Sequence, residues 1–185
     1  MDKKLKYIIS IIIFILVIIG ISRVYNILNT NFQNNDISQK ENMTTQETVL
    51  NQATDFSVYN DKGEEIKLSS FKGKPIVINF WTTWCGYCKV EMKYFEELYN
   101  QYKDDVIFMM VNSTIEDDKQ EVNKYITEQG YTFPVFYDTD GNAVTTYRIT
   151  GYPITMFVNK DFEINRIHQG MINLETLQKN INNIM

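Results

Sequence analysis

The chain has 185 residues, enough for one domain with a hydrophobic core and some accessory sequence, and short for two. Its formal net charge is −5 although its first 23 residues are basic, so the rest of the chain is acidic, which argues against nucleic-acid binding. Two cysteines and one histidine cannot build a four-ligand metal site or a multi-disulfide framework within one chain. Any cysteine chemistry therefore belongs to a single pair.

Residues 1–23 are predicted to form an N-terminal membrane anchor. Three lysines precede an almost unbroken apolar run over residues 7–21. The positive-inside bias then directs the following residues out of the cytoplasm. A run of about 15 to 17 apolar residues is short for a transmembrane helix, so a cleaved signal peptide and a secreted form stay the alternative. We expect a single-pass cell-membrane protein with an extracytoplasmic body.

Residues 24–52 are rich in Asn, Gln, Ser and Thr and keep no helical or strand period. This composition is typical of a flexible linker. From residue 53 to residue 185 the sequence pattern changes to predicted strands that alternate with predicted helices. The sequence therefore predicts an extracytoplasmic linker followed by one folded domain over 53–185.

Several strands are predicted in the folded domain. Residues 56–59 and 66–68 flank the turn signal at 60–63, which favours an added N-terminal β-hairpin. Continuous apolar runs are typical of strands covered on both faces, and they occur at 76–81, 106–111, 133–137 and 154–158. Residues 164–168 are expected to add an edge strand. It contains the single histidine, His168, which is interpreted as a surface or packing residue.

Three helices are expected between and after these strands. The first carries an inward stripe at steps of three and four: Cys88, Met92, Phe95, Tyr99 and Tyr102. The second is predicted to start at Thr114 with Asp117 and to end at Gly130, and the third to start at Asn173. Strands that alternate with helices indicate an α/β fold with helices flanking a sheet.

The motif Trp84-Cys85-Gly86-Tyr87-Cys88 lies where a buried strand gives way to a helix. Cys85 is then at the helix N-terminus, where the partial positive charge of unpaired amides favours a thiolate and lowers the pKa of a cysteine. Cys85 is predicted to be the nucleophile and Cys88, one turn further in, the resolving thiol. Half of a shared metal site and a purely structural disulfide are the alternatives.

Residues 76–89 resemble the active-site strand and helix of the thioredoxin superfamily. More narrowly, residues 53–56, 68–74, 133–135 and 138–141 resemble the membrane-anchored TlpA/ResA-type thioredoxins. The resemblance implies a thioredoxin-like fold with a central mixed β-sheet flanked by helices. It also implies a reductase or isomerase that acts outside the membrane on exported cysteine-containing proteins such as apocytochrome c. A membrane electron donor of thiol type, no cofactor beyond the Cys85–Cys88 disulfide, and a monomeric head domain are expected.

The resemblance assigns a substrate-binding role to Tyr152 and Pro153. It implies that Pro153 is a cis-proline lying against the cysteine pair, and that the backbone of Tyr152 pairs with a bound substrate peptide. From the residues alone, an ordinary loop proline is the simpler interpretation, since few X-Pro bonds are cis. Trp84, Gly86 and Tyr87 are further candidate substrate contacts.

Glu91 is the third candidate catalytic residue. It follows Cys88 by three positions, so the two are neighbours on one side of a helix, and Glu91 is able to accept the Cys88 proton. The resemblance ties a glutamate at this position to thiol reactivity, whereas a solvated helix charge is the alternative interpretation. Asn79 stands where cytoplasmic thioredoxins have a buried aspartate, which favours Glu91 as its substitute.

Two other functions stay open for the cysteine pair. A disulfide-forming oxidase would use the same residues in the opposite direction, and the sequence does not fix the redox potential. A thiol peroxidase of the peroxiredoxin type is the other alternative, but it would require an arginine near the cysteine and none flanks this pair. A non-catalytic adhesion or scaffold domain would keep its function without Cys85.

Overall fold

The computed structural model describes Arg23 and residues 52–185. The predicted anchor and linker therefore lie outside the described residues, apart from Arg23 and Gln52. No helix in the described part combines the length and the apolar composition needed to cross a bilayer. Gln52 forms an isolated antiparallel bridge with Glu163, so ordered pairing begins just before the predicted domain boundary.

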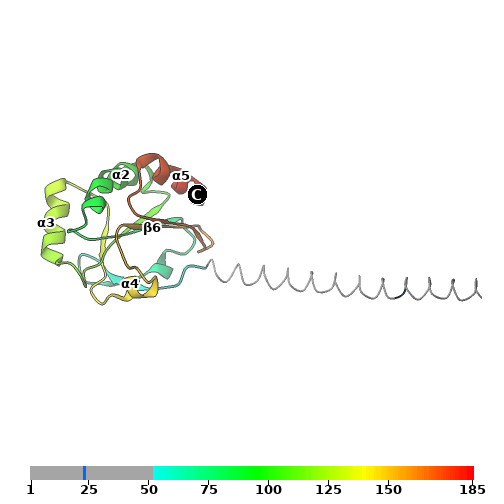
Figure 1. The fold of residues 1–185 in the computed structure, drawn as a ribbon, viewed down its shortest axis with the longest axis horizontal. Coiled ribbons are helices and arrows are strands. Elements are labelled where there is room, and N and C mark those ends of the chain that lie inside the picture. The colour runs from blue at the N-terminus through cyan, green and yellow to red at the C-terminus, as the bar shows by residue number, and fades with distance from the viewer. Residues whose placement is uncertain (1–22, 24–51) are drawn as a thin grey trace, which may run out of the picture. The chain divides into compact units, whose positions relative to one another are not determined.

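A seven-stranded mixed sheet forms the centre of the fold, in the order β2-β1-β5-β4-β3-β6-β7 (Figure 1). The strands are β1 (Ser57–Tyr59), β2 (Glu65–Lys67), β3 (Ile76–Trp81), β4 (Ile107–Asn112), β5 (Val135–Tyr137), β6 (Ile154–Val158) and β7 (Ile164–Gln169). Strands β3, β4 and β5 run parallel, and the other neighbouring pairs are antiparallel. The predicted thioredoxin-like α/β fold with a mixed sheet is confirmed.

Strand β3, an interior strand between β4 and β6, is buried along its whole length. Its residues alternate between two cores, because successive side chains of a strand point to opposite faces. Val77 and Trp81 belong to one core, and Ile76, Ile78 and Phe80 to the other. This double burial explains why the strand reads as an unbroken apolar run.

Helices cover both faces of the sheet. Helices α2 (Gly86–Tyr102), α3 (Lys119–Gln129) and α5 (Leu174–Ile184) contribute to the core that contains Val77 and Trp81. The short helix α4 (Asn142–Thr146) contributes Ala143 to the opposite core. Figure 1 shows α2 and α5 on one side of the sheet and α4 on the other. The 3-10 turn η1 (Leu68–Phe71) follows β2.

Two predictions about helices were wrong or incomplete. Helix α3 does not start at Thr114: its N-cap is Asp118, whose carboxylate accepts hydrogen bonds from the backbone amides of Gln120 and Glu121. Thr114 instead bonds back to Asn112 in a turn, so an earlier helical start is excluded. Helix α4 was not predicted, because five residues with one buried side chain leave no periodic stripe.

The predicted C-terminal end of α3 and the predicted N-terminal start of α5 agree with the structure. Gly130 ends α3 with a φ of 69°, a left-handed conformation that glycine adopts without a steric cost. Asn173 caps α5 by accepting a hydrogen bond from the amide of Thr176.

Replacing Leu177 with alanine should lower the free energy of unfolding by about 2–5 kcal/mol, since Leu177 is fully buried and its truncation leaves a cavity. Leu174→Ala, on the same helix but only half-buried, is the matched control and should cost clearly less. Urea unfolding of both variants measures the difference. Equal losses would contradict the packing of α5 described here.

Candidate active site

The cysteine pair lies at the junction of β3 and α2. Cys85 is the N-cap of α2, and its sulfur accepts a hydrogen bond from the backbone amide of Cys88 at 3.1 Å. The two cysteines form a disulfide, with their Cα atoms 5.3 Å apart. Cys85 is 6% exposed, whereas Cys88 is fully buried. Both cysteines are therefore buried, but Cys85 keeps a small exposed area and Cys88 keeps none.

The helix end favours negative charge on Cys85. Unpaired amides and the aligned peptide dipoles make the first turn of a helix partially positive. In the reduced pair, the Cys88 amide that bonds the Cys85 sulfur would stabilise a thiolate there. The arrangement can therefore supply a sulfur nucleophile at the helix N-terminus.

Glu91 lies on the buried face of α2, one turn beyond Cys88, and is fully buried. Its carboxylate accepts a hydrogen bond from the side-chain amide of Asn79 at 2.9 Å and from the backbone amide of Ile172 at 2.8 Å. The Asn79 amide also donates to the hydroxyl of Thr155 at 3.1 Å. Glu91 is thus not a solvated helix charge.

Burial raises the pKa of Glu91 to about 7, while the hydrogen bonds from Ile172 and Asn79 act in the opposite direction. Burial dominates because it removes the carboxylate from water, which penalises the charged form. A carboxyl group with this pKa can both accept and release a proton near neutral pH. Its neighbour on α2 is the buried Cys88.

The residues around the pair form an exposed rim. Trp84 is 61% exposed and Tyr87 is 69% exposed, and Gly86 between the cysteines is also exposed. The indole N–H of Trp84 donates to the carbonyl of Glu116 at 3.0 Å. The Trp84 ring packs edge-on against the ring of Tyr152, with centroids 5.7 Å apart. Large exposed aromatic side chains therefore flank Cys85 in the sequence and border the cysteine pair.

The Tyr152–Pro153 peptide bond is cis. Pro153 directly precedes β6, whose first residue, Ile154, pairs with Phe80 near the end of β3. The strand register therefore brings the Tyr152–Pro153 bond to the same edge of the sheet as the loop that leads to Cys85. The Trp84–Tyr152 contact joins the two segments.

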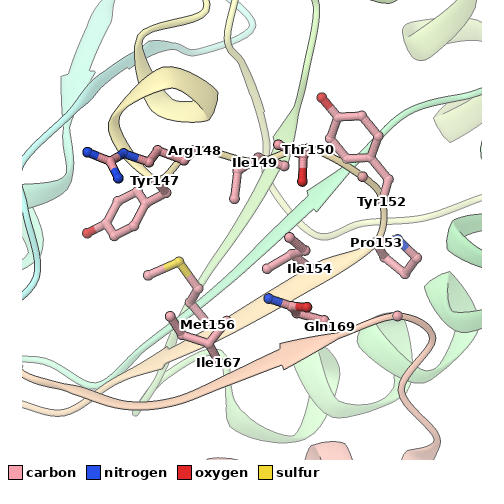
Figure 2. Close-up of a pocket in the computed structure, with 12 residues that line it drawn as sticks. Tyr147, Arg148, Ile149, Thr150, Tyr152, Pro153, Ile154, Met156, Ile167 and Gln169 are labelled. Atoms are coloured by element: carbon pink, nitrogen blue, oxygen red, sulfur yellow. The ribbon is translucent and has the colours of Figure 1, made fainter.

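A pocket of about 330 Å³ lies beside this bond. Figure 2 shows the side chains of Ile154, Met156 and Ile167, from β6 and β7, lining the pocket below the loop that carries Tyr152 and Pro153. Thr150 and Gln169 add polar groups to the lining. The pocket can accommodate an apolar side chain with hydrogen-bonding groups around it.

Sequence reasoning missed two residues of this region. Asn79 was noted only as a departure from an aspartate, whereas it donates directly to Glu91. A polar residue in the middle of an apolar strand was the available signal. Asp117 was interpreted as part of a helix start, but its carboxylate bonds to Thr83 in the loop before Cys85, a contact between residues 34 positions apart. His168 lies in β7, half-buried, with its ring nitrogen against the carbonyl of Met171.

Within the described residues, no group of three or more His, Cys, Asp or Glu side chains is arranged to hold a metal ion. The reactive element is the Cys85–Cys88 disulfide. A disulfide at the N-terminus of the helix that follows an interior strand of a thioredoxin-like sheet defines a thiol–disulfide oxidoreductase.

Comparison with known proteins agrees with this class. The model of the AhpC/TSA family matches residues 49–167, and the chain belongs to this family. The thiol-disulfide oxidoreductase ResA of Oceanobacillus iheyensis is 36% identical over 119 residues, which cover 64% of this chain and 62% of the relative. ResA of Geobacillus kaustophilus is 33% identical over 147 residues, which cover 77% of this chain and 83% of the relative. The crystal structure of StoA from Bacillus subtilis matches with a TM-score of 0.61 and 29% identity, covering 69% of this chain and 96% of StoA.

The buried Glu91 should make the stability of the oxidised protein depend on pH. The folded carboxyl group has a pKa of about 7, above its ordinary value of 4.5, so the folded state holds its proton more tightly than the unfolded state. Stability is therefore highest below about pH 4.5 as far as Glu91 contributes, and falls as the pH rises to about 7. The loss should be about 3 kcal/mol, since a tenfold change in proton affinity corresponds to about 1.4 kcal/mol.

Glu91→Gln should remove most of this pH dependence, measured as the difference between the unfolding free energies at pH 5 and pH 8. Glu97→Gln is the matched control, because Glu97 is an exposed residue of the same helix. An unchanged pH dependence in Glu91→Gln would mean that the Glu91 carboxyl group titrates normally.

Proposed function

We propose that this chain reduces or isomerises disulfides of exported proteins through Cys85 and Cys88, outside the cytoplasm. The observation that carries the proposal is the asymmetry of the pair. Cys85, at a helix N-terminus and with a small exposed area, is bonded to the fully buried Cys88, and a buried carboxyl group lies one turn away. The names of the ResA relatives, thiol-disulfide oxidoreductases, support the same activity.

The first step is attack by the Cys85 thiolate on a substrate disulfide. A bond forms between Cys85 and one substrate sulfur, while the other substrate sulfur leaves as a thiolate and takes up a proton. Cys85 is suited to this step because it caps α2 and, unlike Cys88, keeps a small exposed area.

The second step releases the reduced substrate. Cys88 gives its proton to Glu91 and attacks the sulfur of Cys85, so that the Cys85–Cys88 disulfide forms and the second substrate thiolate leaves. Two electrons pass from the pair to the substrate. A pKa of about 7 suits Glu91 to accept that proton near neutral pH.

The substrate polypeptide would bind across the rim beside Cys85. Trp84, Gly86 and Tyr87 are exposed there, and Tyr152 and Pro153 border the 330 Å³ pocket (Figure 2). The backbone of Tyr152 would pair with the substrate, and the pocket would take a side chain near the substrate cysteine. The pocket lining combines aliphatic side chains with polar ones such as Thr150 and Gln169, which suits a side chain with an apolar body and a polar group.

The cellular setting belongs to the same proposal. The basic and apolar residues 1–23 would anchor the chain in the cell membrane, and residues 24–52 would connect the anchor to a monomeric, extracytoplasmic head. Substrates would be exported cysteine-containing proteins such as apocytochrome c. Because each cycle leaves the pair oxidised, a membrane electron donor of thiol type would have to reduce it again.

Cys85→Ser should abolish the reduction of insulin disulfides by the reduced protein, because the attacking thiolate is lost. Cys88→Ser should still attack but should fail to release its substrate, so a covalent complex accumulates. Non-reducing electrophoresis and mass spectrometry detect this complex. The chain has no other cysteine, so the Cys85→Ser/Cys88→Ser variant is the control and should form none. Insulin reduction by Cys85→Ser at the original rate would refute the proposed function.

The redox potential of the pair distinguishes a reductase from a disulfide-forming oxidase. We expect a potential closer to that of thioredoxin, about −270 mV, than to that of a strongly oxidising exported enzyme, about −120 mV. Equilibration with buffers of defined thiol and disulfide content measures it. A value at the oxidising end would reverse the proposed direction of electron flow, and turnover of hydrogen peroxide would favour the peroxidase alternative.

A further inference from the structure

The loop between β4 and α3, residues 113–118, contacts the active site through its acidic residues. The Asp117 carboxylate accepts four hydrogen bonds. One oxygen, Oδ2, accepts from the backbone amide of Thr83 at 2.6 Å and from the side-chain amide of Asn112 at 2.9 Å. The other, Oδ1, accepts from the Thr83 hydroxyl at 2.6 Å and from the backbone amide of Asp118 at 2.9 Å. The carboxylate thus links the loop to Thr83 through two bonds.

Thr83 lies in the short turn that leads from β3 to Cys85. The Cys85 amide donates to the carbonyl of Thr82 at 3.3 Å, so Cys85 is joined to this turn by a backbone hydrogen bond as well as by the chain. The position of Thr83 therefore affects where Cys85 lies relative to the first backbone amides of α2. Asp117 is the side chain that holds Thr83.

The neighbouring residue Glu116 contacts the rim of the same site. Its carbonyl accepts the indole N–H of Trp84, and its carboxylate accepts the hydroxyl of Tyr152 at 3.3 Å. Within residues 52–185, neither Glu116 nor Asp117 forms a salt bridge. The Asp117 carboxylate therefore accepts its hydrogen bonds from neutral donors. Hydrogen bonds to a charged acceptor are stronger than hydrogen bonds between neutral groups.

We infer that Asp117 is a positioning residue for Cys85: by holding Thr83 it fixes the turn that presents the Cys85 sulfur to the amides at the start of α2. This inference rests on the proposed function and adds a residue to that site. Asp117 acts through Thr83 and takes no part in the sulfur chemistry itself.

The effect of the Asp117 charge and the effect of its hydrogen bonds have opposite signs. Removing a nearby carboxylate would by itself favour the Cys85 thiolate and speed its reactions, because like charges repel. Releasing Thr83 would loosen the alignment of the sulfur with the helix N-terminus and slow them. Small misplacements of a reacting group can cost up to about 100-fold in rate. The direction of the change therefore separates the two effects.

The test measures attack by the reduced full-length chain on a small disulfide, 5,5′-dithiobis(2-nitrobenzoate), over a range of pH. A small disulfide reports on the sulfur without requiring the substrate rim. At the plateau of the pH profile we expect a rate constant lower by about tenfold in Asp117→Ala. Asp117→Asn should lose less, because its carbonyl oxygen can still accept the Thr83 amide. Thr83→Val, which removes only the hydroxyl bond, should lose least.

Asp118→Ala is the matched control. It removes the side-chain cap of α3 but leaves the Asp118 backbone amide that donates to Asp117. It should lower stability, measured by urea unfolding, without slowing Cys85. A plateau rate in Asp117→Ala and Asp117→Asn that equals or exceeds that of the unaltered chain would overturn the inference. If Asp117→Ala does not fold, the Asp117→Asn rate alone decides. Absence of attack by the unaltered chain would instead count against the proposed function.

Discussion

The hydrogen bonds that the buried Glu91 carboxyl group accepts connect the helix that carries the cysteine pair to the neighbouring strands and loop. Glu91 of α2 accepts hydrogen bonds from Asn79 of β3 and from Ile172 of the β7–α5 connection. Asn79 in turn donates to Thr155 of β6. An ionisable group with no solvent exposure is costly unless it is hydrogen-bonded, so these partners must keep their places for the fold to accommodate Glu91. The same partners keep Glu91 next to Cys88.

The two cysteines differ in exposure because Cys85 precedes the first turn of α2, whereas Cys88 lies on the buried face of that turn. Cys85 keeps a small exposed area at the border of the core that α2 shares with β3, whereas Cys88 is fully buried in that core. A helix N-terminus provides unpaired amides for the first sulfur. The buried face of the same helix places the Glu91 carboxyl group one turn beyond the second. One helix therefore supplies both groups that the proposed mechanism uses: the amides beside Cys85 and the carboxyl group near Cys88.

Two different loops contact the region of the cysteine pair: the loop between β4 and α3, and the loop before β6. The β4–α3 loop contacts the turn before Cys85 from one side, through Asp117. The loop before β6 brings Tyr152 and the cis-proline Pro153 to the other side, where the pocket opens between this loop and β7. Glu116 joins the two sides by contacting both Trp84 and Tyr152. These contacts connect segments that are far apart in the sequence.

Elements whose residues repeat with a clear period could be predicted from the residues alone. Strands β3 and β6 were predicted with their observed bounds, and the ends of α3 and α5 follow from Gly130 and Asn173. The position of Cys85 at a strand-to-helix junction was likewise local information, since a buried apolar run and an amphipathic stripe flank the motif.

The contacts of the polar residues, in contrast, could not be predicted without the folded arrangement of the chain. Whether Glu91 is a solvated charge or a buried acid depends on the approach of Asn79 and Ile172, which lie 12 and 81 positions away. The role of Asp117 depends in the same way on Thr83, 34 positions earlier. Local sequence encodes the period of burial along an element, but a single carboxylate has no period. Its hydrogen-bond partners, and with them its pKa, are set by which strands and loops the completed sheet brings together.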